Sequence, residues 1–297
     1  MRLPRGSKLI LLLALLVPFE ALASKPAVKE MNGRVFAGYV YEQVDGTSRQ
    51  VGNSSVTLPE STLGEWGVGG VLTVPILSWL GGRVAVAGGN RSFKLKSEPG
   101  FVGSTRNTSW VEAGLSLFVR DPELGYFDLG YVYDWEDGSG SIVGKKTVNE
   151  LVVSAGFFIP DQGIGPFDWD ADFSYGRAAM DSPALSDRAD EFAVDATIGW
   201  YFTDTFRLSG GIQWLLSKPQ LSFSTQELRG VGKLSWLVPF PARRNITLDL
   251  VGSGGKFERD LAAPFTSIDQ PMYSVGFSMT FSYPGASSLL ELTREYH

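Results

Sequence analysis

The side chains that most often perform catalysis are scarce in this chain of 297 residues. It contains one histidine, His297, at the last position, and no cysteine. A Ser-His-Asp hydrolase needs a histidine that the fold holds beside the nucleophile, and thiolate metal sites and disulfides need cysteine. We therefore expect a protein that is not an enzyme, with no catalytic residue, no cofactor and no metal.

Three alternating carboxylates, Asp168, Asp170 and Asp172, are the candidates for a metal site. Clustered carboxylates can bind Ca²⁺. On an extended strand, however, all three project from one face, and Phe173 stands where an EF-hand loop would have its glycine. Two interpretations stay open at this point: solvated carboxylates inside a barrel, which we favour, and a divalent-cation site.

Acidic and basic side chains separate along the chain when only those expected on the inner face of each strand are considered. The acidic ones fall on four middle strands, and the basic ones come before and after them. The expected acidic wall is Asp128, Asp134, Glu136, Glu150, Asp168, Asp170, Asp172 and Asp195, and the expected basic wall is Arg83, Arg91, Arg120, Arg207, Arg229 and Lys233. In a closed barrel the two walls would be opposed, and fixed charges in a narrow lumen select permeants. Alternatively, the charges pair and plug the lumen.

About twelve segments with two-residue periodicity must position these charges. In residues 273–283, large apolar side chains alternate with small polar ones. Similar segments of about ten residues recur from residue 34 onward, which is the length of a tilted transmembrane strand. The weaker candidates are residues 35–41 and 84–93. The fold class predicted is all-β, a closed antiparallel transmembrane β-barrel of about 12 strands.

The connections alternate in length. Short links such as Asp121-Pro122-Glu123 alternate with longer polar segments, expected at residues 94–109, 178–190 and 254–271. Outer-membrane barrels have short periplasmic turns and long external loops. A soluble β-sandwich, the alternative fold, gives no reason for such alternation.

Residues 1–23 have the pattern of a cleaved signal peptide. A basic stretch precedes the apolar residues 9–17, and Ala21-Leu22-Ala23 precedes Ser24. We expect Sec-type export, a periplasmic N-terminal segment at 24–33, the barrel at 34–283 and a periplasmic tail at 284–297. The formal net charge of −6 argues against a nucleic-acid partner.

The last strand carries a pattern of the form polar-x-Gly-x-x-apolar-x-aromatic, in which Ser274, Gly276, Met279 and Phe281 occupy the defining positions. On this pattern and the repeated strands, the chain resembles the Gram-negative outer-membrane β-barrel superfamily, porin-like in size. The resemblance implies an outer-membrane location, contact with outer-membrane lipid and insertion by the barrel-assembly machinery, which reads this assembly signal. Family members usually end near that aromatic. This chain instead continues to His297, and Ser288-x-x-Glu291 could be a capping box that opens a short helix.

Two functions are compatible with these features. The first is an outer-membrane pore for passive diffusion of small hydrophilic solutes, with mild cation preference because acidic residues are in excess. The alternative is a non-conducting structural or assembly barrel that binds a periplasmic protein through residues 284–297. A translocation barrel for a passenger domain is disfavoured, since few residues separate Ser24 from the first strand.

Overall fold

The computed structural model describes residues 30–51, 54–97, 102–121, 123–139, 144–161, 163–181, 186–221, 223–240, 244–260 and 267–296. The expected signal peptide and most of the segment 24–33 lie outside these residues. Within the described ranges, no helix has both the length and the apolar character needed to cross a bilayer.

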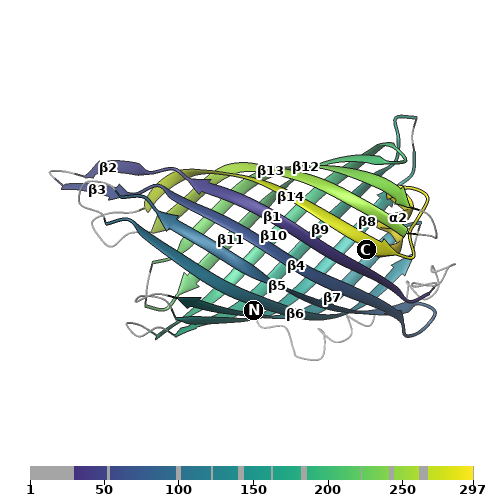
Figure 1. Ribbon diagram of the computed structural model, residues 1–297, viewed down its shortest axis with the longest axis horizontal. Helices are drawn as coiled ribbons and strands as arrows, with labels where there is room; N and C mark the ends of the chain where they lie inside the picture. Colours follow the sequence, from purple (N-terminus) through teal and green to yellow (C-terminus); the bar gives the residue numbers. More distant parts are fainter. Residues whose placement is uncertain are drawn as a thin grey trace, which may run out of the picture.

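Twelve antiparallel strands form a closed barrel (Figure 1). Each barrel strand pairs with the next along the chain, and β1 closes the ring by pairing with β14. This arrangement confirms the predicted fold class. The barrel strands are β1 (Asn32–Val44), β4 (Ser61–Pro75), β5 (Leu80–Leu95), β6 (Ser104–Asp121), β7 (Gly125–Ser139), β8 (Lys145–Ile159), β9 (Phe167–Asp181), β10 (Ser186–Thr203), β11 (Phe206–Pro219), β12 (Thr225–Phe240), β13 (Arg244–Asp260) and β14 (Ser267–Tyr283).

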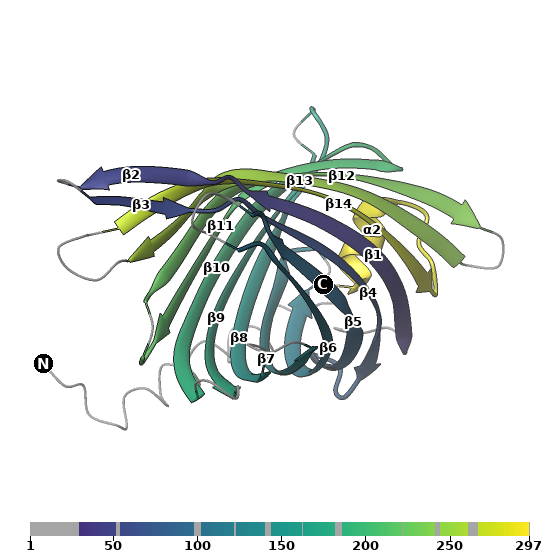
Figure 2. The same ribbon diagram turned by 60° about the vertical axis from the view of Figure 1, so that its left-hand side comes forward.

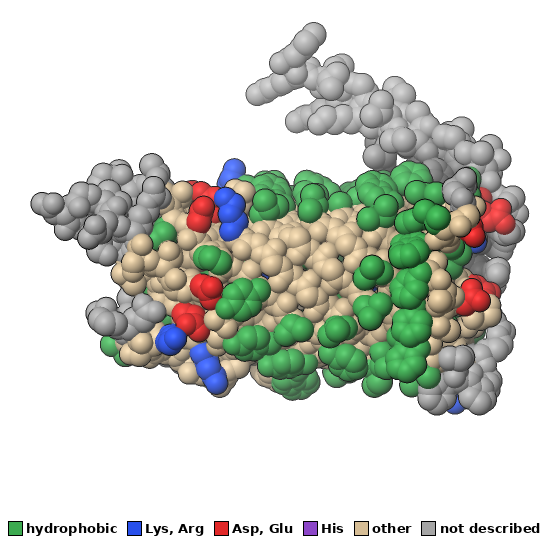
Figure 3. All heavy atoms as spheres, turned by 90° about the horizontal axis from the view of Figure 1, so that it is seen from above, with side chains coloured by type: hydrophobic (Ala, Val, Ile, Leu, Met, Phe, Trp, Pro, Cys, Tyr) green, Lys and Arg blue, Asp and Glu red, His purple; other side chains and the backbone are tan. Residues whose placement is uncertain are grey.

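The barrel has an apolar outer surface and a polar inner one, because successive side chains of a strand point to opposite faces. On β14, Tyr273, Val275 and Phe277 are about half exposed on the outside, whereas Ser282 is fully buried on the inside. Figure 3 shows hydrophobic side chains over the middle of the surface and charged ones toward its ends. An outer apolar band of this kind is what a barrel presents to lipid.

An aromatic girdle marks one end of the outer surface on β9 to β12. Phe167 stacks on Trp200, Phe202 stacks on Phe206, and Phe206 stacks on Trp236 with ring centroids 5.8 Å apart. Trp200 also lies 5.5 Å from Phe202, so the rings are continuous across four strands. Aromatic rings concentrate at this level because the membrane interface satisfies both an apolar ring and a polar atom.

We call the end with this girdle, where β1 begins and β14 ends, the turn end, and the opposite end the loop end. The long loops expected at residues 94–109, 178–190 and 254–271 are wrong in extent. Strands occupy half or more of each range: β5 continues to Leu95, β9 to Asp181 and β13 to Asp260. Backbone pairing does not require apolar side chains, so polar strand ends beyond the apolar band resemble loops in the sequence.

The longest connection at the loop end joins β1 to β4. It contains the hairpin of β2 (Thr47–Val51) and β3 (Ser54–Leu58), which projects beyond the barrel (Figures 1 and 2). Gln270 on β14 anchors the base of this excursion, because its side-chain amide donates to the backbone oxygen of Asp45 at 2.8 Å.

A helix, α2 (Leu289–Tyr296), follows the barrel. The Ser288 hydroxyl accepts a hydrogen bond from the Glu291 backbone N–H at 3.1 Å, and the Glu291 carboxylate accepts one from the Ser287 N–H at 2.8 Å. These reciprocal bonds satisfy N–H groups that a helix start leaves without partners. Figure 2 shows α2 within the ring of strands at the turn end.

Candidate functional site: the charged lumen

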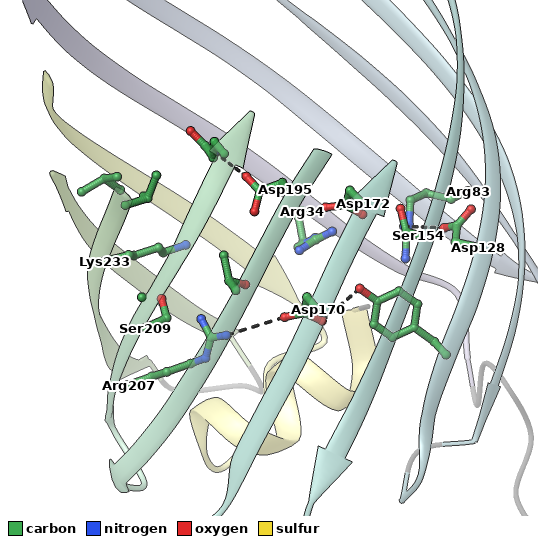
Figure 4. Close-up of a pocket in the computed structure, with 16 residues that line it drawn as sticks. Arg34, Arg83, Asp128, Ser154, Asp170, Asp172, Asp195, Arg207, Ser209 and Lys233 are labelled. Atoms are coloured by element: carbon green, nitrogen blue, oxygen red, sulfur yellow. Dashed lines mark hydrogen bonds and ion pairs between the residues drawn. The ribbon is translucent and has the colours of Figure 1, made fainter. Parts of the chain in front are cut away.

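The lumen contains a cavity of about 470 Å³ in its middle part (Figure 4). Its lining is mostly polar and comes from strands on all sides of the barrel. Seven residues of the two expected walls reach it: Asp128, Asp170, Asp172, Asp195, Arg83, Arg207 and Lys233. They converge because each occupies an inward position of its strand, and the strands close into a ring.

Asp168 is fully buried at the turn-end side of this cavity. Arg207 Nη2 lies 2.7 Å from its Oδ1, and the Tyr201 hydroxyl donates to its Oδ2 at 2.5 Å. The same guanidinium is 3.7 Å from Asp170, whose carboxylate also accepts a hydrogen bond from Tyr126 at 3.0 Å. This network satisfies a charge that would be costly to bury alone.

The two walls meet rather than standing wholly opposed, which corrects the expected arrangement. Arg207 on β11 and Asp168 on β9 flank the single strand β10. Likewise, Arg83 on β5 lies 2.9 Å from Asp128 on β7, and Arg91 on β5 contacts Glu136 on β7. Strands two positions apart are separated by only about 10 Å, which an arginine side chain spans. Basic residues at the borders therefore pair with the acidic wall.

Asp172 and Asp195 form the uncompensated part of the cavity. They are directly opposite one another in the register of β9 and β10. Asp195 accepts a hydrogen bond from the Gln213 side-chain amide, and neither carboxylate has an ion pair among the described residues. Like charges at directly opposed positions are destabilising. The result is a local excess of negative charge facing the cavity.

The remaining wall residues lie above and below the cavity. Asp134 and Glu150 are electrostatic neighbours of Glu112. Arg229 is 2.7 Å from Glu42. Lys233, which lines the cavity, is 3.1 Å from Asp249. Arg120 is buried, with its guanidinium 5.6 Å from the centre of the Phe118 ring.

Several lumen charges escaped the sequence analysis. The structure adds Arg34, Glu42, Glu65, Glu112, Lys146, Glu191, Glu227 and Asp249 to the inner surface. The signal that could have found them is the alternation itself. Glu112, for example, stands between two residues of an outward apolar row, and Arg34 precedes outward Val35.

A second cavity of about 170 Å³ lies between α2 and the barrel wall. Leu289, Leu292 and Thr293 of α2 line it, facing residues of β1 and β11 to β14. Arg34, Arg207 and Lys233 line both this cavity and the larger one. The three cations therefore lie where the middle of the lumen meets the helix.

The divalent-cation interpretation of Asp168, Asp170 and Asp172 gains no support from their environment. Asp168 is already bonded to Arg207 and Tyr201. In the part of the chain that the structure describes, no three acidic or histidine side chains are grouped so that they could hold a metal ion.

The residues of the expected assembly signal all lie on β14. Ser274 and Gly276 point inward, and Met279 and Phe281 point outward, where they are exposed. In the pairing with β1, Gly276 is opposite Val40 and Phe281 is opposite Val35. The signal is therefore part of the strand that closes the barrel.

The sequence matches no model of a protein family and no curated protein. Among solved structures, an outer-membrane channel from Pseudomonas putida F1 is similar at 11% identity over 88% of this chain and 98% of that one, with a TM-score of 0.50. The translocator domain of the autotransporter NalP from Neisseria meningitidis is 12% identical over 93% of this chain and 96% of that one, with a TM-score of 0.48. At such identities the likeness concerns the fold, and the chain has the fold of an outer-membrane β-barrel.

Proposed function

We propose that this protein is an outer-membrane channel for passive diffusion of small hydrophilic solutes, with a preference for cations. The observation that carries the proposal is the lumen cavity of about 470 Å³, lined by charged and polar side chains from strands around the ring. A polar, charge-lined interior inside an apolar outer surface is the arrangement of a permeation path.

The charges of the lumen favour cations in this account. Arg83, Arg207 and Lys233 each have an acidic partner close by. Asp172 and Asp195 have no such cationic partner among the described residues, so they leave net negative charge beside the cavity. Arg34 on β1 is a fourth cation that lines the cavity, and β9 with Asp170 and Asp172 is six positions from β1 around the twelve-strand ring, so these charges also set up a field across the lumen. Figure 4 shows these side chains around the same space.

The proposal includes the cellular setting. The chain would reach the outer membrane of a Gram-negative cell by Sec-type export and would be inserted by the barrel-assembly machinery through its β14 signal. The turn end, with α2, would face the periplasm, as short turns do in bacterial barrels. No catalytic step, cofactor or nucleic acid has a part in this function.

Conductance of the purified, folded barrel in planar lipid bilayers tests the proposal. Single-channel steps and a reversal potential of the cation-selective sign in a salt gradient are expected. A folded barrel that never conducts, with α2 present or removed, would exclude the channel.

The alternative is a non-conducting structural barrel that captures a periplasmic protein through residues 284–297. The ion pairs along the wall and the helix in the turn-end mouth favour it. However, Leu289 and Leu292 are buried against the barrel, so capture through them would require α2 to leave. Pull-downs with the full chain and with a variant lacking the tail distinguish this function from the channel: tail-dependent capture without conductance would support it.

A further inference from the structure

We propose that α2 is a built-in plug that narrows the turn-end mouth of the lumen, and that its departure opens this mouth. The inference rests on the proposed channel function. It assigns a role to the residues that follow the barrel, which the channel itself does not require.

The dimensions of the barrel and the helix agree with this role. Twelve strands spaced about 4.8 Å apart and tilted by about 40° close into a cylinder about 24 Å across at the backbone. An α-helix with its side chains is about 10–12 Å thick. Only about 6 Å remains on each side, which is one layer of inward side chains. A single helix therefore takes up about half of the width of the mouth and narrows it.

The helix is seated on apolar contacts from one side of the mouth. Leu289 and Leu292 form a buried cluster with Tyr201 of β10 and Leu237 of β12. Leu237 is only 1% exposed, although it points into a lumen that is otherwise polar. A large apolar side chain at such a position loses its contact with water only while α2 is docked.

Directional contacts fix the position of α2. The Leu289 backbone N–H donates to the backbone oxygen of Asp204 in the β10–β11 turn at 2.8 Å. Asn245 of β13 donates through its side-chain amide to the Ala286 backbone oxygen at 2.6 Å. The Arg294 guanidinium lies 5.4 Å from the centre of the Phe158 ring of β8. The helix and the segment before it thus contact inward or turn-end residues on several sides of the barrel.

The adjoining part of the seat, on β13 and β14, is polar, and some of its groups have no hydrogen-bond partner among the described residues. Thr247 and Ser282 are buried, and their hydroxyl oxygens have no hydrogen-bond partner among the described residues. Asp249 Oδ1 is in the same condition. All three residues line the cavity of about 170 Å³ beside α2. Beside this cavity the helix therefore lacks close contact with the wall, which suits a plug that can leave.

Thiol accessibility tests the plug without relying on conduction. The chain has no cysteine, so Thr247→Cys introduces a single thiol behind α2. With a charged maleimide and the barrel in detergent micelles, we expect labelling to be many-fold slower in the full chain than in a variant that lacks residues 289–297. Ser104→Cys, exposed at the loop end, is the control and should label equally fast in both backgrounds. Equal Thr247→Cys labelling rates in both backgrounds would overturn the plug.

A disulfide provides a second variant in which the whole chain is kept. The hydrogen bond from Leu289 to Asp204 places their backbones side by side, so Asp204→Cys with Ser288→Cys should tie the start of α2 to the β10–β11 turn. Combined with Leu237→Asp, which unseats α2, the pair should give low conductance when oxidised and a several-fold higher conductance after reduction, with no redox response in either single-cysteine variant. Conductance that is unchanged by reduction, in a barrel that conducts, would reject the plug.

The two assays separate the two proposals. If removal of residues 289–297 speeds labelling of Thr247→Cys but no variant conducts, the plug is supported and the channel is rejected. If the full chain conducts as well as the shortened one and labelling does not change, the channel is supported and the plug is rejected.

Discussion

The turn-end part of the lumen and its middle part use the same kinds of side chains in different ways. At the turn end, Asp168 is fully buried and is held by Arg207 and Tyr201, while α2 narrows the mouth. In the middle, Asp172 and Asp195 face a cavity and lack a cationic partner among the described residues. Two inward carboxylates of β9 thus have different roles: Asp168 belongs to a buried ion-pair network, and Asp172 contributes negative charge to the cavity.

The largest effect is expected where an apolar contact holds the plug. Leu237→Asp places a charge in the cluster that seats Leu289 and Leu292, and an unpaired charge is unfavourable in such a cluster. We expect α2 to leave and single-channel conductance to rise several-fold in planar bilayers, as in the shortened chain. Leu237→Met keeps the contact and is the control. If the Leu237→Asp barrel is folded and conducts like the original protein, the turn-end part of the lumen does not restrict conduction, and the proposed difference from the middle part is wrong.

The next effect concerns the stability of the turn-end network. Arg207→Ala leaves Asp168 buried without its cation, which costs about 3–5 kcal/mol when a buried ion pair loses one partner. The free energy of unfolding, measured with urea on the lipid-reconstituted barrel, should fall accordingly. The matched control is Arg177→Ala, since the pair of Arg177 and Asp190 is exposed on the outside and such pairs contribute about 0–1 kcal/mol. Equal losses in the two variants would contradict the account.

A smaller change is expected from the middle of the lumen. Asp172→Asn and Asp195→Asn each remove one of two opposed like charges, so stability should rise by about 0.2–1 kcal/mol. Each should also lower the cation preference, seen as a reversal potential closer to zero in a salt gradient, with a larger shift in the double variant. An unchanged reversal potential in the double variant would show that these two carboxylates do not determine the ion selectivity of the channel.

The smallest effect is confined to the β8–β9 turn. Asp161 accepts hydrogen bonds from the backbone N–H groups of Gly163 at 2.7 Å and Gly165 at 2.8 Å, and these bonds hold the pKa of its carboxyl below the usual value. Both glycines have positive φ, at 97° and 101°, a conformation that suits glycine.

The sign of the pH dependence follows from that lowered pKa. The contribution of Asp161 to stability is complete above the unfolded pKa of about 3.9 and is lost as the pH falls through the lower folded value. The amide NMR shifts of Gly163 and Gly165 should titrate with a midpoint below that of an ordinary aspartate and should lose the transition in Asp161→Asn. A midpoint at or above the ordinary value would show that the turn does not stabilise the carboxylate.

The alternation of apolar and polar residues predicted the barrel, because a two-residue period is a property of each single strand. Tyr273 to Tyr283, read two residues at a time, separate lipid-facing from lumen-facing side chains, and closure follows once twelve such strands must leave no free edge. The ends of strands such as β5 and β13 were harder to predict. Beyond the apolar band, the side chains on the two faces of such a strand no longer differ in polarity. Hydrogen bonding to the neighbouring strand, rather than side-chain pattern, extends these strands.

The lumen was only partly predictable for a geometric reason. The sequence orders Asp168 and Arg207 by strand, and it indicates that both point inward. It does not say how far each side chain reaches, so the pairing of Arg207 with Asp168 across β10 had to come from the structure. The capping pattern at Ser288 and Glu291 indicated a helix, but nothing in it shows that Leu237, near the end of β12, faces that helix in the mouth.

The central claim is that the charged lumen is a cation-preferring path through the barrel. The most direct measurement is the reversal potential of the folded, full-length protein in a planar bilayer under a potassium chloride gradient. The account predicts discrete conductance steps with a reversal potential of the cation-selective sign, reduced toward zero in the Asp172→Asn, Asp195→Asn double variant. Channels that conduct with anion selectivity, or no conductance from a folded barrel with and without α2, would contradict it.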